Sequence, residues 1–257
     1  MFQRLMYEHA GIYLAPEKKV MVASRLAKRL QYYGLPNYGA YYRLLNEPEF
    51  NDEFQVMVNF LTTNETYFFR EPKHFEFFQE QIIKHWRGDQ FKAWSAACSS
   101  GEEVYSLAMV LAENLGKKNW QVLGSDLSTR VLDIASNGVY SMMRLEQMDQ
   151  NLLKKYCLRG VRSQEGYFRV DDAIRSRTRF EQINLMKPLP TSFVKNFDVI
   201  FLRNVLIYFD QDTKKAVVDR IVKALKPGGY FFISHSESLH GVNDDLSMIK
   251  PSIFRKK

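Results

Sequence analysis

Cysteine is scarce in this sequence, and long apolar runs are absent. The 257 residues contain two cysteines, Cys98 and Cys157, which lie outside any C-x-x-C pair, and the five histidines show no spacing typical of metal ligands. A disulfide scaffold or a metal site is therefore not expected, and a reducing cytoplasm fits this composition best. No apolar run approaches the roughly 20 residues of a membrane span, and the first residues lack the apolar centre of a signal peptide. We expect no insertion into a membrane.

The composition is that of a globular protein with an excess of positive charge. Hydrophobic residues make up 46% of the chain and charged residues 25%, a balance that supports a packed core. The net charge of +7 is compatible with an acidic partner such as nucleic acid, an anionic membrane or an acidic protein. A basic protein without such a partner would show the same excess, so charge alone does not choose between these classes.

Helical periodicity is the only regular pattern at the start of the chain. Pro16–Tyr33 is predicted to form one amphipathic helix. Lys18, Arg25 and Arg29 fall on one side of this helix and form a basic ridge. We predict a helical N-terminal domain over residues 1–85.

From residue 86 onward, short apolar runs alternate with helical segments. The expected strands are Phe91–Ala97, Trp120–Ser125, Phe197–Leu202 and Tyr230–Ser234, and the expected helices are Glu102–Leu115, Thr129–Ser136 and Asp212–Leu225. This alternation predicts an α/β fold with a doubly wound, mostly parallel sheet over residues 86–257. Leu225–Gly229 is expected to be a tight turn before the last strand. Such sheets bind ligands beyond the carboxyl ends of their strands.

Residues 147–180 interrupt the alternation and are predicted to form an inserted β-subdomain. Short strand-like pieces occur there, with Gly160 and Gly166 as turn residues. The expected strands of a small antiparallel sheet are Tyr156–Leu158, Tyr167–Val170 and Arg179–Ile183.

The turn after the first strand has the residues of a ligand-binding loop. Small residues from Ser95 to Gly101 would let the backbone approach a ligand, and the following helix start offers free N–H groups. Glu102 and Glu103 at that helix start would repel a pyrophosphate and suit an ammonium group. An ordinary capped helix start remains an alternative interpretation.

Polar residues follow two further strands at the same predicted edge. Asp126 comes directly after the second strand, where an acidic side chain can bind both ribose hydroxyls of an adenosine. Its alternative role is that of a helix N-cap. Arg203, Asn204 and Tyr208 emerge where the strand from Phe197 ends, although Tyr208 would also suit a core position.

Four segments of the chain resemble the CheR-type family of methyltransferases that modify chemoreceptor glutamates. They are Asn64–Arg70, Cys98–Ser106, Gly124–Asp126 and Arg203–Asp210, and together they span most of the chain. The resemblance implies a class I S-adenosylmethionine-dependent methyltransferase with an N-terminal helical domain and an inserted β-subdomain. It also implies that the chain forms glutamate γ-methyl esters on the cytoplasmic signalling domain of chemoreceptors and releases S-adenosylhomocysteine.

The resemblance also assigns roles to individual residues. Arg70 and Tyr208 are expected to border the transferred methyl group as catalytic residues. The expected cofactor-binding residues are Asn64, Thr66, Arg70, Glu103, Asp126, Asn184, Leu185, Arg203 and Asn204. The nucleophile would be a glutamate carboxylate, which is already ionised at neutral pH, so no general base is needed.

Substrate docking is expected at two places. The basic ridge of Lys18, Arg25 and Arg29 would attract glutamate-rich receptor helices, although such a ridge is often only a solvated face. In the inserted subdomain, the loop Arg159–Gly166, with Gly160, Arg162 and Gly166, resembles the form able to bind a receptor C-terminal peptide. Arg162 and Arg169 would pair with acidic groups of that peptide. A purely structural insertion is the alternative there.

Nucleic-acid methylation and receptor binding without catalysis are the two alternative functions. A nucleic-acid methyltransferase would fit the positive charge, but Arg203–Leu206 does not match the Asn/Asp-Pro-Pro-aromatic motif of amino-methylating enzymes. Neither Cys98 nor Cys157 follows a proline, as the nucleophile of base-carbon methylation commonly does. A receptor-binding adaptor without cofactor is disfavoured because Arg70, Asp126 and Tyr208 are intact. We expect a cytoplasmic monomer that binds no nucleic acid.

Overall fold

A seven-stranded sheet forms the centre of the computed structural model, which describes residues 1–145, 148–191, 193 and 195–257. Its strand order is β6-β2-β1-β7-β8-β10-β9. The strands are β1 (Gln90–Ser95), β2 (Asn119–Asp126), β6 (Thr178–Gln182), β7 (Phe197–Phe201), β8 (Leu225–Phe232), β9 (Leu246–Lys250) and β10 (Ile253–Lys256). The first five in spatial order run parallel, and β10 and β9 form an antiparallel edge. The predicted doubly wound, mostly parallel sheet is confirmed.

Side chains alternate between two apolar cores, one on each face of the sheet. On β1, Phe91 and Ala93 join one core, and Trp94 joins the other. The first core is shared with α6 (Glu102–Leu115), and the second is shared with α10 (Gln211–Val222). Helices on both faces are what a parallel sheet requires, because neither face can remain in water.

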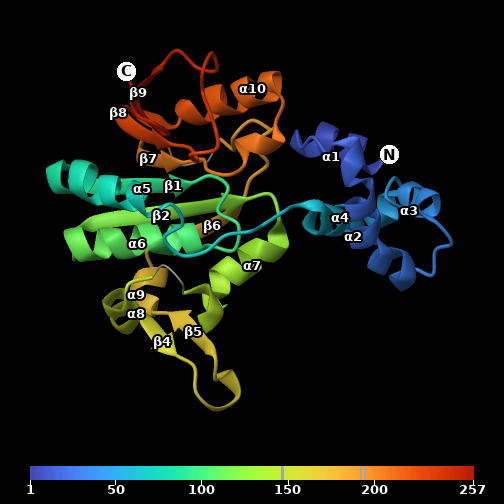
Figure 1. The fold of residues 1–257 in the computed structure, drawn as a ribbon, viewed down its shortest axis with the longest axis horizontal. Helices are drawn as coiled ribbons and strands as arrows, with labels where there is room; N and C mark the ends of the chain where they lie inside the picture. Colours follow the sequence, from blue (N-terminus) through green and yellow to red (C-terminus); the bar gives the residue numbers. More distant parts are fainter. Residues whose placement is uncertain (146–147, 192, 194) are drawn as a thin grey trace.

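The first part of the chain forms a helical unit with its own core (Figure 1). Its elements are α1 (Phe2–Ala10), η1 (Pro16–Lys18), α2 (Lys19–Tyr32), α3 (Tyr38–Leu44), η2 (Pro48–Phe50) and α4 (Asn51–Leu61). Met6, Leu26, Tyr41 and Met57 are fully buried between these helices. The helix expected over Pro16–Tyr33 is present, with its first turn in the tighter 3₁₀ form.

The segment from Phe68 to Ile83 packs with the sheet and not with the N-terminal helices. Its elements are α5 (Pro72–Phe77) and the helical turns η3 (Phe78–Ile82) and η4 (Ile83–His85). Phe75 and Phe78 lie in the same core as α6. A domain boundary at residue 85 stays a prediction, but the apolar contacts of these turns are with the core of the main sheet.

A three-stranded antiparallel sheet lies apart from the main sheet, below it in Figure 1. Its order is β3 (Val139–Ser141), β5 (Tyr167–Val170) and β4 (Cys157–Arg159). The short helices near it are η5 (Met142–Arg144), α7 (Thr129–Asn137), α8 (Gln150–Tyr156), η6 (Arg162–Gln164) and α9 (Asp172–Arg175). The predicted boundary at Gln147 lies outside the described residues.

Two strand predictions were wrong in detail. Arg179–Ile183 does not join the small sheet, because β6 pairs in parallel with β2 and thereby covers its outer edge. Val139–Ser141, which was not predicted, supplies the third small strand. The expected turn Leu225–Gly229 lies within β8 as an irregularity, since Leu225 pairs with Phe197 and Tyr230 already pairs with Val199. Gly228 takes a left-handed φ of 73° in that irregular stretch.

A helix that crosses a membrane must be long and apolar. In the described ranges, no helix combines the length and apolar character that a membrane span requires.

Candidate functional site

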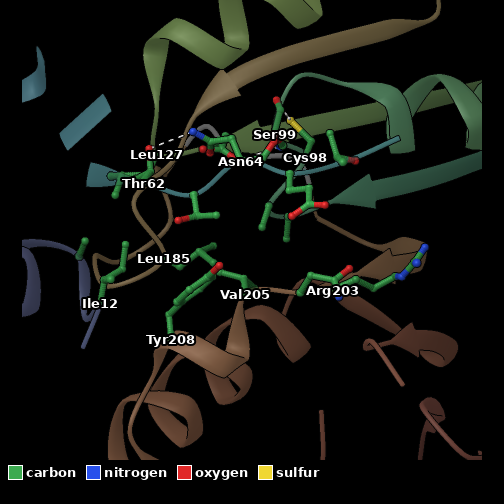
Figure 2. A pocket seen from close by; sticks show the side chains of 18 of the residues that line it. Ile12, Thr62, Asn64, Cys98, Ser99, Leu127, Leu185, Arg203, Val205 and Tyr208 are labelled. Carbon is green, nitrogen blue, oxygen red and sulfur yellow. Dashed lines mark hydrogen bonds between the residues drawn. The ribbon is translucent and has the colours of Figure 1, made fainter. Parts of the chain in front are cut away.

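A pocket opens where β1, β2 and β7 end, at the point where the strand order reverses (Figure 2). Residues 96–99, Asp126 and residues 203–205 line it from these three strands. Residues 61–67 and the first helices line it from the N-terminal side. This is the position at which open parallel sheets bind nucleotide-like ligands. All of the predicted cofactor-binding and catalytic residues border this one pocket.

The turn after β1 separates the two neighbouring glutamates. Gly101 has a φ of 95°, and an added Cβ would lie 2.7 Å from the Cβ of Ala135, so only glycine fits. Glu103 borders the pocket. Glu102 is fully buried, accepts a 2.7 Å hydrogen bond from Ser100 Oγ and pairs with Arg144. The expectation that both glutamates serve the ligand is corrected, because consecutive helical residues point in different directions.

Arg203 is the buried cation of the site, with a side chain only 1% exposed. Its Nη2 donates a 2.6 Å hydrogen bond to the carbonyl of Arg70, and its Nη1 lies 3.2 Å from Glu103 Oε2. Glu103 Oε1 also accepts a 2.6 Å bond from Ser95 Oγ. Burial raises the pKa of Glu103, while the charge of Arg203 opposes this rise. Arg203 thus holds the Arg70 carbonyl and the Glu103 carboxylate, while its Nε and Nη1 have no hydrogen-bond partner among the described residues, so its ligand-binding role stays a prediction.

Asp126 precedes α7 but is not its N-cap, which is Ser128, and its ribose role stays a prediction. Its carboxylate accepts a 2.9 Å hydrogen bond from the N–H of Ser99 and another of 2.9 Å from the N–H of Ser128. The second bond supports the start of α7, and the first fixes the β1 turn. A carboxylate has about four acceptor positions, so two remain for ribose hydroxyls. Burial raises the pKa of Asp126, and the N–H bonds oppose that effect.

The segment before α5 forms the opposite wall of the pocket. Asn64 is tied to the β1 turn, since its carbonyl accepts a 2.9 Å bond from Ser99 Oγ. Thr66 lines the pocket nearby. Arg70 donates a 2.8 Å bond to the carbonyl of Glu65, and within the described part of the chain it forms no ion pair. Its guanidinium is therefore available for a ligand carboxylate.

Asn184 and Leu185 are neighbours on the loop after β6, and one is polar and the other apolar. The Asn184 amide donates a 2.6 Å hydrogen bond to the carbonyl of His9, and its Oδ1 accepts a 2.9 Å bond from the N–H of Met186. These bonds attach α1 to the loop after β6, so the Asn184 amide is committed to the fold. Leu185 is buried and contributes apolar surface to the pocket.

Tyr208 ends a one-turn helix, η7 (Leu206–Tyr208), and its side chain borders the pocket (Figure 2). It is half-buried and belongs to neither apolar core, which argues against the core interpretation. Its carbonyl accepts a 2.9 Å hydrogen bond from the N–H of Tyr13. Asn204, at the start of this loop, has a left-handed φ of 58°. The loop thus carries backbone strain next to the pocket.

Glu237 holds this loop in place and was missed by the sequence analysis. Its carboxylate accepts hydrogen bonds from the N–H groups of Asn204 (3.1 Å), Leu206 (2.8 Å) and Ser234 (2.8 Å). The only local signal was a glutamate shortly after an apolar strand. That signal is weak, because the three donors come from two separated segments.

The three residues of the predicted basic ridge have different environments. Lys18 is exposed at the pocket, with its ammonium 5.7 Å from the ring of Tyr208. Arg25 donates hydrogen bonds of 3.0 and 3.2 Å to the carbonyls that end α4. Arg29 forms an ion pair with the buried Glu53, through a 2.7 Å bond to its Oε1. A continuous free ridge is therefore wrong, because two of the three cations stabilise the helical unit.

The predicted peptide-binding loop lies on the small sheet and away from the pocket. An added Cβ at Gly160 would lie 2.0 Å from the carbonyl oxygen of Gln164, and Gly166 has a φ of 84°. Arg162 takes a left-handed φ of 55°, a region that favours glycine. Arg169 is 3.1 Å from Asp172 in an exposed ion pair. Gly160, Arg162 and Gly166 thus lie between β4 and β5, Arg169 lies on β5 itself, and none of the four is among the residues that line the pocket.

Comparison with known families agrees with this architecture. A model described as "CheR methyltransferase, SAM binding domain" matches residues 64–254, and one described as "CheR methyltransferase, all-alpha domain" matches residues 1–62. The fold and the match to a SAM-binding domain define a class I S-adenosylmethionine-dependent methyltransferase. Within this class, the chain belongs to the CheR methyltransferase family.

Curated relatives cover nearly the whole chain. A chemotaxis protein methyltransferase from Escherichia coli (strain K12) is 41% identical over 91% of this chain and 82% of its own length. Chemotaxis protein methyltransferase 2 from Pseudomonas aeruginosa is 42% identical over 91% of this chain and 83% of its own length. A relative from Salmonella typhimurium is 38% identical over 98% of this chain and 87% of its own length.

Asp126→Ala is predicted to weaken S-adenosylhomocysteine binding at least tenfold. Charge-assisted hydrogen bonds are worth about 1.5–3 kcal/mol each, and the variant would remove the acceptor for the ribose. Isothermal titration calorimetry measures the change. Asp133→Ala, at an exposed position of α7, is the matched control and should bind normally. Unchanged affinity in a folded Asp126→Ala variant would refute the ribose assignment.

Proposed function

We propose that this chain transfers the methyl group of S-adenosylmethionine to glutamate side chains of chemoreceptor cytoplasmic signalling domains. The products are a glutamate γ-methyl ester and S-adenosylhomocysteine, and the reaction takes place in the cytoplasm. The observation that carries the proposal is the gathering of Arg70, Glu103, Asp126 and Tyr208 around one pocket at the strand switch point. The chemotaxis methyltransferase names of its relatives support the choice of receptor.

The charges around the pocket fit the two ends of the proposed cofactor. Asp126 would bind the ribose hydroxyls, with the apolar side chain of Leu185 against the adenine. Glu103 would bind the α-ammonium group, and Arg70 would bind the α-carboxylate. Asn64, Thr66 and Asn204 complete the wall. When bound, the cofactor supplies an electrophilic methyl group on a sulfonium.

The protein's own contribution is alignment of the acceptor. A glutamate carboxylate with a pKa of about 4.3 is ionised at neutral pH, so no proton must be removed. Positioning two reactants can contribute roughly 7–11 kcal/mol to catalysis. Tyr208 lies at the pocket entrance on the Glu237-anchored loop, where its hydroxyl can orient the incoming carboxylate. Arg203 acts indirectly by holding the Arg70 carbonyl and the Glu103 carboxylate.

The structure also bears on nucleic-acid methylation as a second candidate. Cys98 is 1% exposed, and burial raises its pKa well above the ordinary thiol value. A thiol in this environment is a poor nucleophile for base-carbon methylation. We therefore favour an acidic protein helix over nucleic acid as the partner of the basic surface.

Incubation with methyl-labelled S-adenosylmethionine and a panel of receptor signalling domains tests the function directly. The expected result is protein-bound label that base treatment releases, as an ester requires. Tyr208→Phe should lower kcat while the affinity for S-adenosylhomocysteine and the melting temperature stay near wild type. Tyr13→Phe, a nearby exposed tyrosine, is the matched control. Base-stable label would rule out ester formation, and full activity of Tyr208→Phe would remove the role of its hydroxyl.

Of the three residues in the predicted basic ridge, we propose Lys18 for receptor docking. Lys18→Glu should raise KM for the receptor, with unchanged cofactor affinity, because it reverses charge at the pocket entrance. Arg29→Ala should behave differently and destabilise the fold by about 3 kcal/mol, since it leaves Glu53 buried without its ion-pair partner. Urea unfolding and receptor kinetics separate the two effects. Lys28→Glu, exposed on the same helix, is the control for charge alone. An unchanged KM for Lys18→Glu would return this residue to the solvated surface.

The edge strand β4 is the proposed binding place for a receptor C-terminal peptide. It pairs only with β5 in the small sheet, and Leu158 and Val161 are 52% and 69% exposed. An extended peptide could add to this edge through main-chain hydrogen bonds. The Gly160 N–H points inward, since it donates a 2.8 Å bond to the Tyr167 carbonyl. By alternation along the strand, the Arg159 N–H points outward.

Arg159→Pro is predicted to abolish peptide binding with little change in stability. Proline removes the outward N–H, and proline is tolerated on edge strands at such positions. Arg159→Ala keeps the N–H and should keep binding. Calorimetric titration of C-terminal pentapeptides from candidate receptors measures the effect. If no pentapeptide binds the wild-type chain and tail-less receptors are methylated normally, the insertion is a structural element only.

A further inference from the structure

Three potential metal ligands from distant parts of the chain converge beside Arg203. Glu71 and His74 lie at the start of α5, and His235 follows β8. His74 Nδ1 lies 3.3 Å from Glu71 Oε2, and His235 Nε2 lies 3.7 Å from the same oxygen. The three ligand atoms are all within 4.8 Å of one another.

Ser252 determines which nitrogen of each imidazole carries a proton. Its Oγ lies 2.5 Å from the carbonyl of Pro251, 2.7 Å from His74 Nε2 and 3.0 Å from His235 Nδ1. A serine hydroxyl has one proton and two lone pairs. When its proton is donated to the Pro251 carbonyl, both imidazoles donate to Ser252. The opposite nitrogens, His74 Nδ1 and His235 Nε2, are then left with free lone pairs.

In this tautomer both lone pairs face Glu71 Oε2, which the backbone N–H of His235 also approaches at 3.3 Å. The His74 side chain is 1% exposed, and among the described residues its Nδ1 has no hydrogen-bond partner. The buried Nδ1 is a polar atom that a bound cation would satisfy.

We propose that Glu71, His74 and His235 bind a divalent transition-metal ion of the zinc type. The ligand atoms are Glu71 Oε2, His74 Nδ1 and His235 Nε2. Two imidazoles and one carboxylate are a common zinc donor set, with a fourth position left for water. The His235 side chain is 49% exposed, which gives the metal a path from solvent. Ser252 would orient both histidines, because hydrogen-bond partners of metal-binding residues commonly fix the orientation of those residues.

The neighbouring charges permit a cation at this position. Arg203 Nη2 lies 3.5 Å from Glu71 Oε2 and would by itself repel a metal. However, Arg203 Nη1 lies 3.2 Å from Glu103 Oε2, so one guanidinium faces two carboxylates. Arg203, Glu71 and Glu103 together have a net negative charge, and a bound divalent ion would make the net charge positive. A bound ion would join the loop that carries Arg70 to the end of β8.

The lengths of zinc–ligand bonds determine how far apart the ligand atoms must lie. Zinc–ligand bonds of about 2.0–2.1 Å place neighbouring ligand atoms of a tetrahedral site roughly 3.4 Å apart. The separations from Glu71 already agree with this value. The remaining pair, His74 Nδ1 and His235 Nε2, lies within 4.8 Å.

Zinc chloride titrated into the chelator-stripped full chain tests the proposal by calorimetry, with cobalt(II) absorption as a second probe. We expect one ion per chain and the visible bands of a four-coordinate cobalt site. His235→Ala and Glu71→Gln should weaken zinc binding at least about tenfold, and Ser252→Ala by about 10–100-fold. His85→Ala, at an exposed histidine on η4, should bind as tightly as wild type.

Near-ultraviolet circular dichroism of each variant shows whether it is folded, and the half-exposed His235 is the substitution least disruptive to the core. The proposal is overturned if the wild-type chain shows neither zinc heat nor cobalt bands. It is equally overturned if folded His235→Ala binds zinc as tightly as wild type.

Discussion

The buried guanidinium of Arg203 is the interaction on which the pocket wall depends. It joins the Arg70 carbonyl, the Glu71 carboxylate and the Glu103 carboxylate, which come from the loop before α5 and from the start of α6. A charge in this position is tolerated only because its partners offset the cost of removing it from water. Loss of Arg203 would therefore free two buried carboxylates at once and release the loop that carries Arg70. The side chains of the pocket wall are thus ordered by a residue that itself borders the pocket, and its Nε and Nη1 have no hydrogen-bond partner among the described residues.

Backbone conformation provides the second constraint on the site. Phe69, Glu71, Ser99 and Asn204 all have positive φ values; Ser99 and Asn204 line the pocket, and Phe69 and Glu71 flank the pocket residue Arg70. Such conformations cost of order 1–3 kcal/mol each and persist only where the surroundings hold them. Glu237 supplies part of this support for the Asn204 loop through three N–H bonds. The strain is concentrated where loops must direct several side chains toward one ligand.

The helical unit and the sheet form the pocket together. Asn59 donates a 3.0 Å bond to Thr129 Oγ1, and Gln55 donates a 3.1 Å bond to the Leu127 carbonyl. The His9 carbonyl accepts from Asn184, and the Tyr13 N–H donates to the Tyr208 carbonyl. The two regions matched by separate family models are therefore joined by hydrogen bonds at the rim of the site. The N-terminal helices are therefore part of the wall of the pocket.

The alternation of apolar runs and helical segments determined the doubly wound sheet, because a parallel sheet buried on both faces needs such runs and crossover helices. It also located Asp126 and Tyr208, since the carboxyl ends of parallel strands meet at one edge. Arg179–Ile183 was assigned to the wrong sheet, because the sequence of a short strand does not specify which strand it pairs with. In the structure it pairs with the outer edge of β2. Arg29 was taken for a docking charge because its partner Glu53 lies on another helix. The Glu237 anchor and the Glu71, His74 and His235 cluster were likewise decided by tertiary structure alone, since hydrogen bonds and ligand sets depend on distances in space that residue spacing does not contain.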